Sequence, residues 1–198
     1  MALTALPVHA TDEAPDALIK RLSTEVLDSI RADKAIQGGD VSRVVSLVDA
    51  KIMPNVNFQR MTASAVGPGW RQATPEQQKR LQDEFKTLLV RTYAGALAQV
   101  SDQIIAVKPL RAAADDNEVI VRTEVKGRGE SIQLDYRLEK TAGQGAGWKI
   151  YNLNVLGVWL VETYKSQFAQ EINAKGIDGL IAALAERNKS NAAHAKKS

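Results

Sequence analysis

Three features of the sequence combine residue types that can do chemistry. Asp135 and Tyr136 could supply a general base and a hydroxyl donor, but adjacent residues of a strand point to opposite faces and cannot share one pocket. The glycine-rich run from Gly143 to Gly147 lacks the Lys-Ser/Thr ending of a phosphate loop and leads into a predicted strand. Lys149 could be an amine nucleophile, although burial statistics favour a solvated lysine on the outer face of a strand. None of the three therefore favours catalysis.

Cysteine and histidine are nearly missing from the sequence. It has no cysteine, and its two histidines, His9 and His194, lie close to the two ends. The folded part therefore offers no histidine for a catalytic triad, a general base or a metal site. We predict no catalytic residue, no metal site, no cofactor and no enzyme activity. An isomerase with an Asp base and a Tyr donor in an apolar pocket is the enzyme alternative.

Composition indicates one globular domain. The chain has 198 residues, 44% of them apolar, and 26 Lys and Arg against 23 Asp and Glu. The charges of 21–33 and 80–86 alternate in sign, which argues against a nucleic-acid partner. Four cations and no acid lie in the last twelve residues: Arg187, Lys189, Lys196 and Lys197. Without these four charges the net charge of +3 becomes −1, and we expect 187–198 to be a basic, disordered tail.

The first ten residues resemble the end of a secretory signal. Val8 and Ala10 occupy the −3 and −1 places of a cleavage site, so the mature chain would begin at Thr11. We interpret 1–10 as a signal-peptide remnant; a disordered N-terminus of a cytosolic protein is the alternative. The sequence contains no uninterrupted run of 18 apolar residues, so it does not predict a membrane-spanning helix.

Hydrophobic periodicity predicts helices first, then strands, then helices. Helical spacing follows Pro15, Asn57 and the capping box Thr74-Pro75-Glu76-Gln77, and it resumes after Gly157. The period changes to two in 104–107, 119–125, 132–138 and 148–155, with glycine-rich hairpin loops between the later runs. We predict an α+β fold over 11–186, a single domain in which helices pack on one curved four-stranded antiparallel sheet.

Two segments resemble a known family. The first is Trp70-Arg71-Gln72-Ala73-Thr74-Pro75-Glu76-Gln77, continuing through Leu88-Leu89-Val90-Arg91-Thr92-Tyr93. The second runs from Trp148-Lys149-Ile150-Tyr151 through Gly157-Val158 to Gly176-Ile177-Asp178-Gly179-Leu180-Ile181. Together they resemble the MlaC/toluene-tolerance (Ttg2-type) family over about 16–184.

The resemblance implies a soluble periplasmic phospholipid carrier of Gram-negative bacteria. Such a carrier would move lipid between an inner-membrane ABC-transporter complex with its substrate-binding ring and an outer-membrane lipoprotein–porin complex, which maintains outer-membrane lipid asymmetry. It would be a monomer shaped like a nuclear-transport-factor cone, with an apolar cavity for its cargo. Asn152, Trp159, Glu162-Thr163 and Lys165 depart from the family pattern, which puts pocket shape and lipid preference in doubt. A ligand-free envelope adaptor is the alternative function.

Two sets of residues are candidates for lipid contact. An apolar cavity must shield the acyl chains, with the phosphate left at its mouth. The predicted wall consists of Met61, Phe85, Leu89, Tyr93, Val121, Leu134, Tyr136, Ile150, Val161 and Tyr164. Arg71, Arg91 and Lys165 flank the apolar stripes and are candidates to face the phosphate. Plain core packing for the first set, and solvated helix charges for the second, explain the same patterns.

Overall fold

The computed structural model describes residues 13–113 and 115–195, with side chains as far as residue 192. The predicted signal remnant lies outside these residues. The α-helices are α1 Pro15–Ala32, α2 Lys34–Gln37, α3 Val41–Leu47, α4 Phe58–Val66, α5 Pro75–Ala98 and α6 Leu160–Ala195. The strands are β1 Ile104–Val107, β2 Glu118–Lys126, β3 Ile132–Lys140, β4 Trp148–Val155 and β5 Val158–Trp159. A π-helical turn, Val48–Ile52, and two 3-10 turns, Met53–Asn55 and Gly67–Arg71, lie between helices.

Capping residues start the helices where the sequence predicts. The Asn57 side chain accepts the Arg60 amide at 3.0 Å at the start of α4. Thr74 and Gln77 form the predicted reciprocal capping box at the start of α5, at 3.2 and 2.9 Å. The predicted helix before Pro54 is α-helical only as far as Leu47, continues as the π-helical turn to Ile52, and is followed by the 3-10 turn that contains Pro54.

The sheet is antiparallel, in the order β1-β2-β3-β4-β5. The predicted count of four strands was one short, because β5 has two residues and is too brief to show alternation. A register shift lies between Arg137 and Leu138, so Leu138 pairs with Ile150 whereas Tyr136 pairs with Leu153. The side chains of Leu138, Ile150, Tyr136 and Leu153 all lie on one face of the sheet, which we call the inner face.

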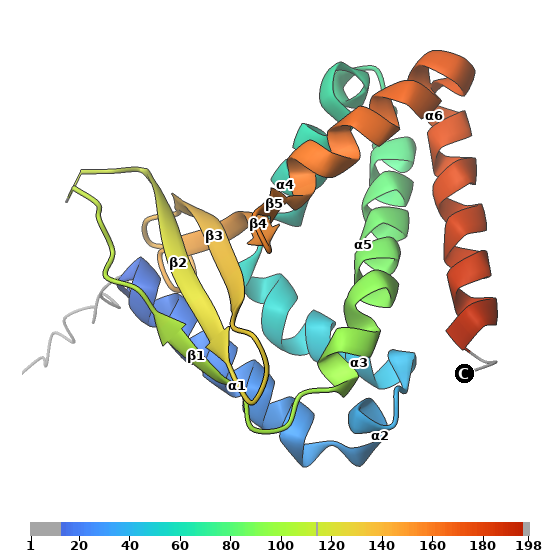
Figure 1. The fold of residues 1–198 in the computed structure, drawn as a ribbon. Helices are drawn as coiled ribbons and strands as arrows, with labels where there is room; N and C mark the ends of the chain where they lie inside the picture. Colours follow the sequence, from blue (N-terminus) through green and yellow to red (C-terminus); the bar gives the residue numbers. More distant parts are fainter. Residues whose placement is uncertain (1–12, 114, 196–198) are drawn as a thin grey trace, which may run out of the picture.

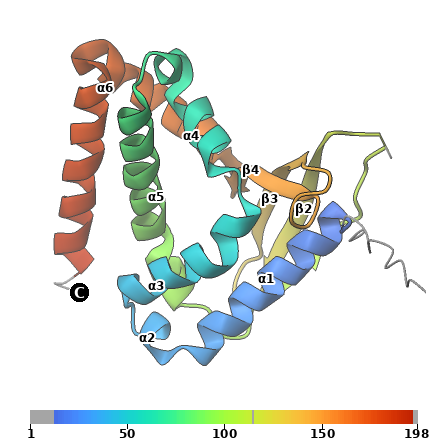
Figure 2. The same cartoon turned by 180° about the vertical axis from the view of Figure 1, so that it is seen from behind.

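The helices cover the sheet unevenly. Figures 1 and 2 show α1 lying across the sheet, while α4, α5 and α6 form a separate group beyond β4. α5 packs against α6, α4 and α3, and the helical group reaches the sheet through contacts of α4 and α6 with β4. The fold is therefore the predicted α+β arrangement on one open sheet.

α6 reverses direction at Gly176, whose φ of +70° is unavailable to a regular helix. The second half returns alongside α5 and ends near the C-terminus (Figure 1). The helix includes residues 187–195, so the prediction of disorder is wrong for this part of the tail. The reason is Asn188, which is 4% exposed and donates to the Glu84 carbonyl and carboxylate of α5.

The core has two large parts. The helical cluster contains buried residues of α4, α5 and α6: Phe58, Met61, Ala65, Val66, Leu81, Phe85, Leu88, Leu160, Val161, Tyr164, Phe168, Leu180, Ile181 and Leu184, with Ala73 from the preceding loop. The sheet–α1 cluster contains Leu18, Ile19, Leu22, Val119, Val121, Leu138, Trp148 and Ile150. A smaller third cluster joins α1, α2 and α3 to the end of α5.

Candidate lipid-binding site

The structure divides the ten predicted wall residues between the two large clusters. Six belong to the helical cluster or pack against it: Met61, Phe85, Leu89, Tyr93, Val161 and Tyr164. Val121, Tyr136 and Ile150 belong to the sheet–α1 cluster or pack against it. Leu134 is half-buried on the inner face, between Thr123 of β2 and Val155 of β4. The predicted wall is therefore two surfaces and not one.

Phe85 is the centre of the helical cluster. Its ring has no exposed surface and lies 5.0 Å from Tyr164, 5.2 Å from Phe168 and 5.7 Å from Phe58, measured between ring centroids. The first two contacts are edge-to-face, which aromatic pairs favour. Phe85 therefore already has a complete set of protein neighbours.

Half-buried apolar side chains pack against the helical cluster from β4, from α5 and from the segment before α4. Leu153 and Val155 are on the inner face of β4, yet they pack against the helical cluster, as do Leu89 and Tyr93 of α5. Val56 packs against both clusters and forms a bridge with Ile150 of β4. We use the name junction residues for Val56, Leu89, Tyr93, Leu134, Leu153 and Val155.

Sequence reasoning missed three junction residues. From β4 it selected only Ile150, which lies on the inner face. The register shift moves Leu153 and Val155 onto the same face. No local signal in the sequence marks this shift. Val56 follows a 3-10 turn, and its inward position depends on the tertiary bridge to Ile150.

Two half-buried tyrosines have raised pKa values. Burial raises the pKa of Tyr93, and the nearby Tyr164 adds to the shift. Burial also raises the pKa of Tyr136, although hydrogen bonds with Ser23 and Thr123 oppose the change. Both phenols stay neutral near pH 7, so the apolar surfaces carry no phenolate charge.

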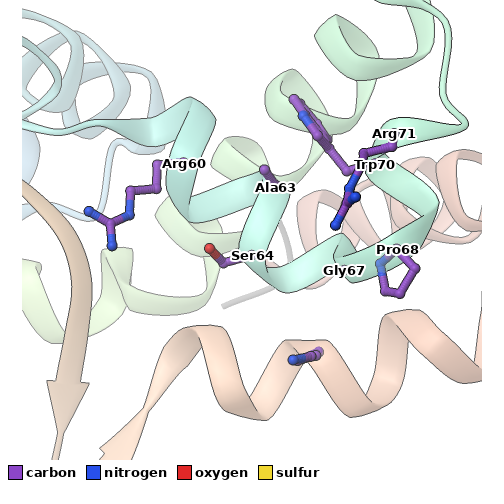
Figure 3. Close-up of a pocket in the computed structure, with 8 residues that line it drawn as sticks. Arg60, Ala63, Ser64, Gly67, Pro68, Trp70 and Arg71 are labelled. Atoms are coloured by element: carbon purple, nitrogen blue, oxygen red, sulfur yellow. The ribbon is translucent and has the colours of Figure 1, made fainter.

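Two of the three predicted head-group cations come together. Arg71 and Lys165 line an open hollow of about 450 Å³ between α4, the turn 67–71 and α6. The rest of its lining is Arg60, Ala63, Ser64, Gly67, Pro68 and Trp70 (Figure 3). We call this feature the cationic hollow. None of the ten predicted wall residues lines it.

The three cations of the hollow differ in their partners. Arg60 forms ion pairs with Glu118 and Glu139 of the sheet, and its guanidinium lies 3.7 Å from the centre of the Tyr151 ring. Within the described part of the chain, neither Arg71 nor Lys165 has an acidic partner within 4 Å, and no acid lines the hollow. Two uncompensated cations therefore share one concave surface.

Arg91, the third predicted head-group cation, lies elsewhere. It is half-buried on α5, and its guanidinium donates to the backbone carbonyl of Asn188. This contact helps to hold the second half of α6 on α5. A second hollow, of about 200 Å³, involves Ser29, Asp33, Ile36, Arg43, Ser46 and Leu47, and Arg43 there pairs with Asp33 at 2.7 Å.

Asp135 and Tyr136 do not share one pocket. Tyr136 faces the sheet–α1 cluster, whereas Asp135 lies on the opposite face, where it accepts from Gln133 at 2.7 Å. Over the described residues, no group of three His, Cys, Asp or Glu side chains could hold a metal ion. In the same residues, no helix has the length and apolarity needed to cross a bilayer.

An open antiparallel sheet with a helical group at one end, half-buried apolar side chains on both parts, and a cationic hollow formed by α4, the turn 67–71 and α6 together define an α+β domain. The sequence model of the MlaC protein family matches residues 20–186. The chain therefore belongs to the MlaC family.

Three similar proteins agree with this assignment. Toluene tolerance protein ttg2D of Pseudomonas putida is 27% identical over 179 residues, which cover 89% of this chain and 81% of that protein. The intermembrane phospholipid transport system binding protein MlaC of Haemophilus influenzae is 24% identical over 183 residues, which cover 90% of this chain and 86% of that protein. A structure of a phospholipid-binding protein from Ralstonia solanacearum, in complex with a phospholipid, matches with a TM-score of 0.85 and 50% identity. It covers 89% of this chain and 98% of that one.

Proposed function

We propose that this protein is a phospholipid carrier that holds acyl chains against its junction residues. The observation that carries the proposal is the Ralstonia solanacearum structure, because a chain 50% identical over nearly its whole length has a phospholipid bound. Membership of the MlaC family supports the same function.

Shielding of the acyl chains sets the main physical requirement. Each methylene removed from water contributes about 0.8 kcal/mol, so two chains of about sixteen carbons represent roughly 25 kcal/mol. A shallow surface groove cannot supply this shielding. Acyl chains inserted between the helical cluster and the inner face would meet apolar side chains on both sides: Val56, Leu89, Tyr93, Leu134, Leu153 and Val155.

The proposal includes a location and partners. The carrier acts in the periplasm as a monomer, after cleavage of the leader at about Ala10. It receives and delivers lipid at an inner-membrane ABC-transporter complex with a substrate-binding ring and at an outer-membrane lipoprotein–porin complex, which maintains outer-membrane lipid asymmetry. The family and the name of the Haemophilus influenzae relative support this part of the proposal.

The first experiment measures what the protein carries. Gently purified protein is extracted with organic solvent, the extract is analysed by mass spectrometry, and phosphorus is determined per protein on the same sample. We expect stoichiometric phospholipid. Folded protein that lacks lipid and takes none from liposomes would refute the carrier and support the alternative, a ligand-free envelope adaptor.

Bulky substitutions test where the lipid lies. Leu89→Trp and Leu134→Trp place a large ring at two junction residues from opposite sides, and each should lower lipid per protein at least twofold. Ile104→Trp is the control, because Ile104 is 60% exposed at the edge of the sheet. Unchanged lipid in both junction variants would exclude these surfaces as the acyl-chain wall.

A further inference from the structure

The cationic hollow differs from the other charged surfaces near it in the balance of its charges. Nearby, Arg137 of β3 pairs with Glu162 of α6, and Arg60, the third cation of the hollow, pairs with Glu118 and Glu139 of the sheet. Arg71 and Lys165 have no such compensation in the described part of the chain. Two like charges brought to one concavity repel each other, and a bound anion would remove that cost.

The hollow is built on a fixed turn. Gly69 packs so closely on α6 that an added Cβ would lie 3.1 Å from Ile172, and the Trp70 carbonyl accepts the Gln78 side chain at 2.9 Å. Gly67 has a φ of +69°, and an added Cβ would lie 3.9 Å from Lys165 Cε. The turn and α6 therefore hold Arg71 and Lys165 on opposite walls of the hollow.

The side chains around the hollow have different directions. Figure 3 shows the Arg71 guanidinium turned back toward Gly67 and Ser64, over the hollow, whereas Arg60 extends away from it. Arg60 points toward its acidic partners on the sheet. The Ser64 hydroxyl is exposed at the same surface and can donate a third hydrogen bond.

We propose that the cationic hollow binds the phosphate group of a ligand between Arg71 and Lys165, with Ser64 as an additional donor. Arg is suited to two parallel hydrogen bonds with phosphate oxygens, and Lys supplies a compact charge. A volume of about 450 Å³ accommodates more than the phosphate itself, such as a glycerophosphate group. The proposal rests on the proposed function in one respect: it takes a phospholipid head group as the source of the phosphate.

The test compares a double variant that loses two positive charges in the hollow with a control that loses two positive charges elsewhere. Arg71→Gln/Lys165→Gln removes both cations of the hollow. Lys79→Gln/Lys126→Gln removes two cations from exposed positions elsewhere. All four side chains are exposed, so both proteins should fold, and circular dichroism checks this. Each protein is titrated with sn-glycerol 3-phosphate, with inorganic phosphate, and with vesicles of phosphatidylglycerol in phosphatidylcholine.

We expect the hollow variant to bind sn-glycerol 3-phosphate and the vesicles at least tenfold more weakly than wild type, and the control to change less than twofold. If the hollow variant binds both phosphate compounds and the vesicles more weakly, the hollow is a general phosphate site. If only its binding to vesicles is weaker, the hollow is a site for a lipid head group. Equal affinity of the hollow variant and the control for all three probes would overturn the proposal.

The outcome is independent of the carrier function. Lipid content of the wild-type protein is measured separately, by phosphorus per protein. A lipid-free protein that still binds sn-glycerol 3-phosphate through Arg71 and Lys165 would keep the phosphate site and refute the carrier. A lipid-loaded protein whose hollow variant binds all three probes as tightly as the control would keep the carrier and refute the site.

Discussion

The helical cluster and the inner face of the sheet use apolar residues in different ways. In the helical cluster, Phe85 has no exposed surface and touches three aromatic rings. On the inner face, Leu134, Leu153 and Val155 are only half-buried. A side chain whose neighbours are complete stabilises the fold, whereas a half-buried one keeps surface that a ligand can cover. The residues that hold the fold and those that we propose to contact an acyl chain are therefore largely separate.

The largest expected difference between the two regions is in the free energy of unfolding lost when one side chain of each is truncated to alanine. Phe85→Ala should lower the free energy of unfolding by about 3–5 kcal/mol, because it removes a ring that is fully packed. Leu134→Ala should lower it by about 1 kcal/mol, because part of that side chain is already in solvent. Urea denaturation of delipidated protein measures both. Equal losses would remove the distinction between the two regions.

Removal of lipid should affect the inner face more than the helical cluster. A ligand present at about 100 times its Kd stabilises the folded state by about 2.7 kcal/mol, so delipidated protein should unfold at a lower temperature. Amide exchange should rise in β3 and β4 on delipidation and change little in α4 around Met61. Identical unfolding temperatures and exchange rates in the two states would contradict a lipid at the junction.

Much of the fold could be predicted from local signals. The capping box at Thr74 and the alternation in β2 and β3 depend on neighbouring residues, and the structure confirms these elements. The helical end of the chain, 187–195, was predicted wrongly because its order depends on the buried contacts of Asn188 with Glu84 and Arg91 on α5. Charge composition alone indicated a solvated tail.

The candidate site could be predicted only in part. Apolar periodicity selected Leu89, Tyr93 and Leu134, which are half-buried in the structure, but it equally selected Phe85, which is fully buried in the helical cluster. Periodicity reports which side of an element is apolar and not what covers it. The meeting of Arg71 and Lys165 depends on the turn 67–71 and on the packing of Gly69 against α6, about a hundred residues later in the sequence.

The closure of the helical cluster by the second half of α6 depends on the reversal at Gly176. Gly176→Ala should destabilise the protein by about 1–3 kcal/mol, because a φ of +70° with a ψ of −172° is a backbone conformation essentially restricted to glycine. Gly95→Ala is the matched comparison, since Gly95 is exposed within α5 and should become more stable by about 0.5–1 kcal/mol. An added Cβ meets nothing within 4 Å at either position, so both effects come from the backbone. Changes of the same sign in thermal unfolding would contradict this explanation.

The smallest expected effect concerns the ion pairs that connect α4 to the sheet. Hydrogen bonds from Arg60 and then from Tyr151 lower the pKa of Glu118 below its ordinary value of 4.5, against the opposing effect of burial. A carboxylate with a lowered folded-state pKa stabilises the protein above its unfolded-state pKa, and this contribution is lost as the pH falls through the folded-state pKa. Since the Glu118 side chain is 53% exposed, we expect only a few tenths of a kcal/mol.

Glu118→Gln should therefore flatten the fall in stability between about pH 5 and pH 3, measured by urea denaturation at each pH. Glu130→Gln is the control, because Glu130 is an exposed acid in the loop between β2 and β3. A steeper fall in Glu118→Gln than in wild type would mean that the carboxylate is not stabilised by Arg60 in the folded protein. The connection between α4 and the sheet would then depend on Asn57 at the start of α4 and Glu139 of β3. The Asn57 side chain donates a hydrogen bond of 2.6 Å to the Glu139 carboxylate.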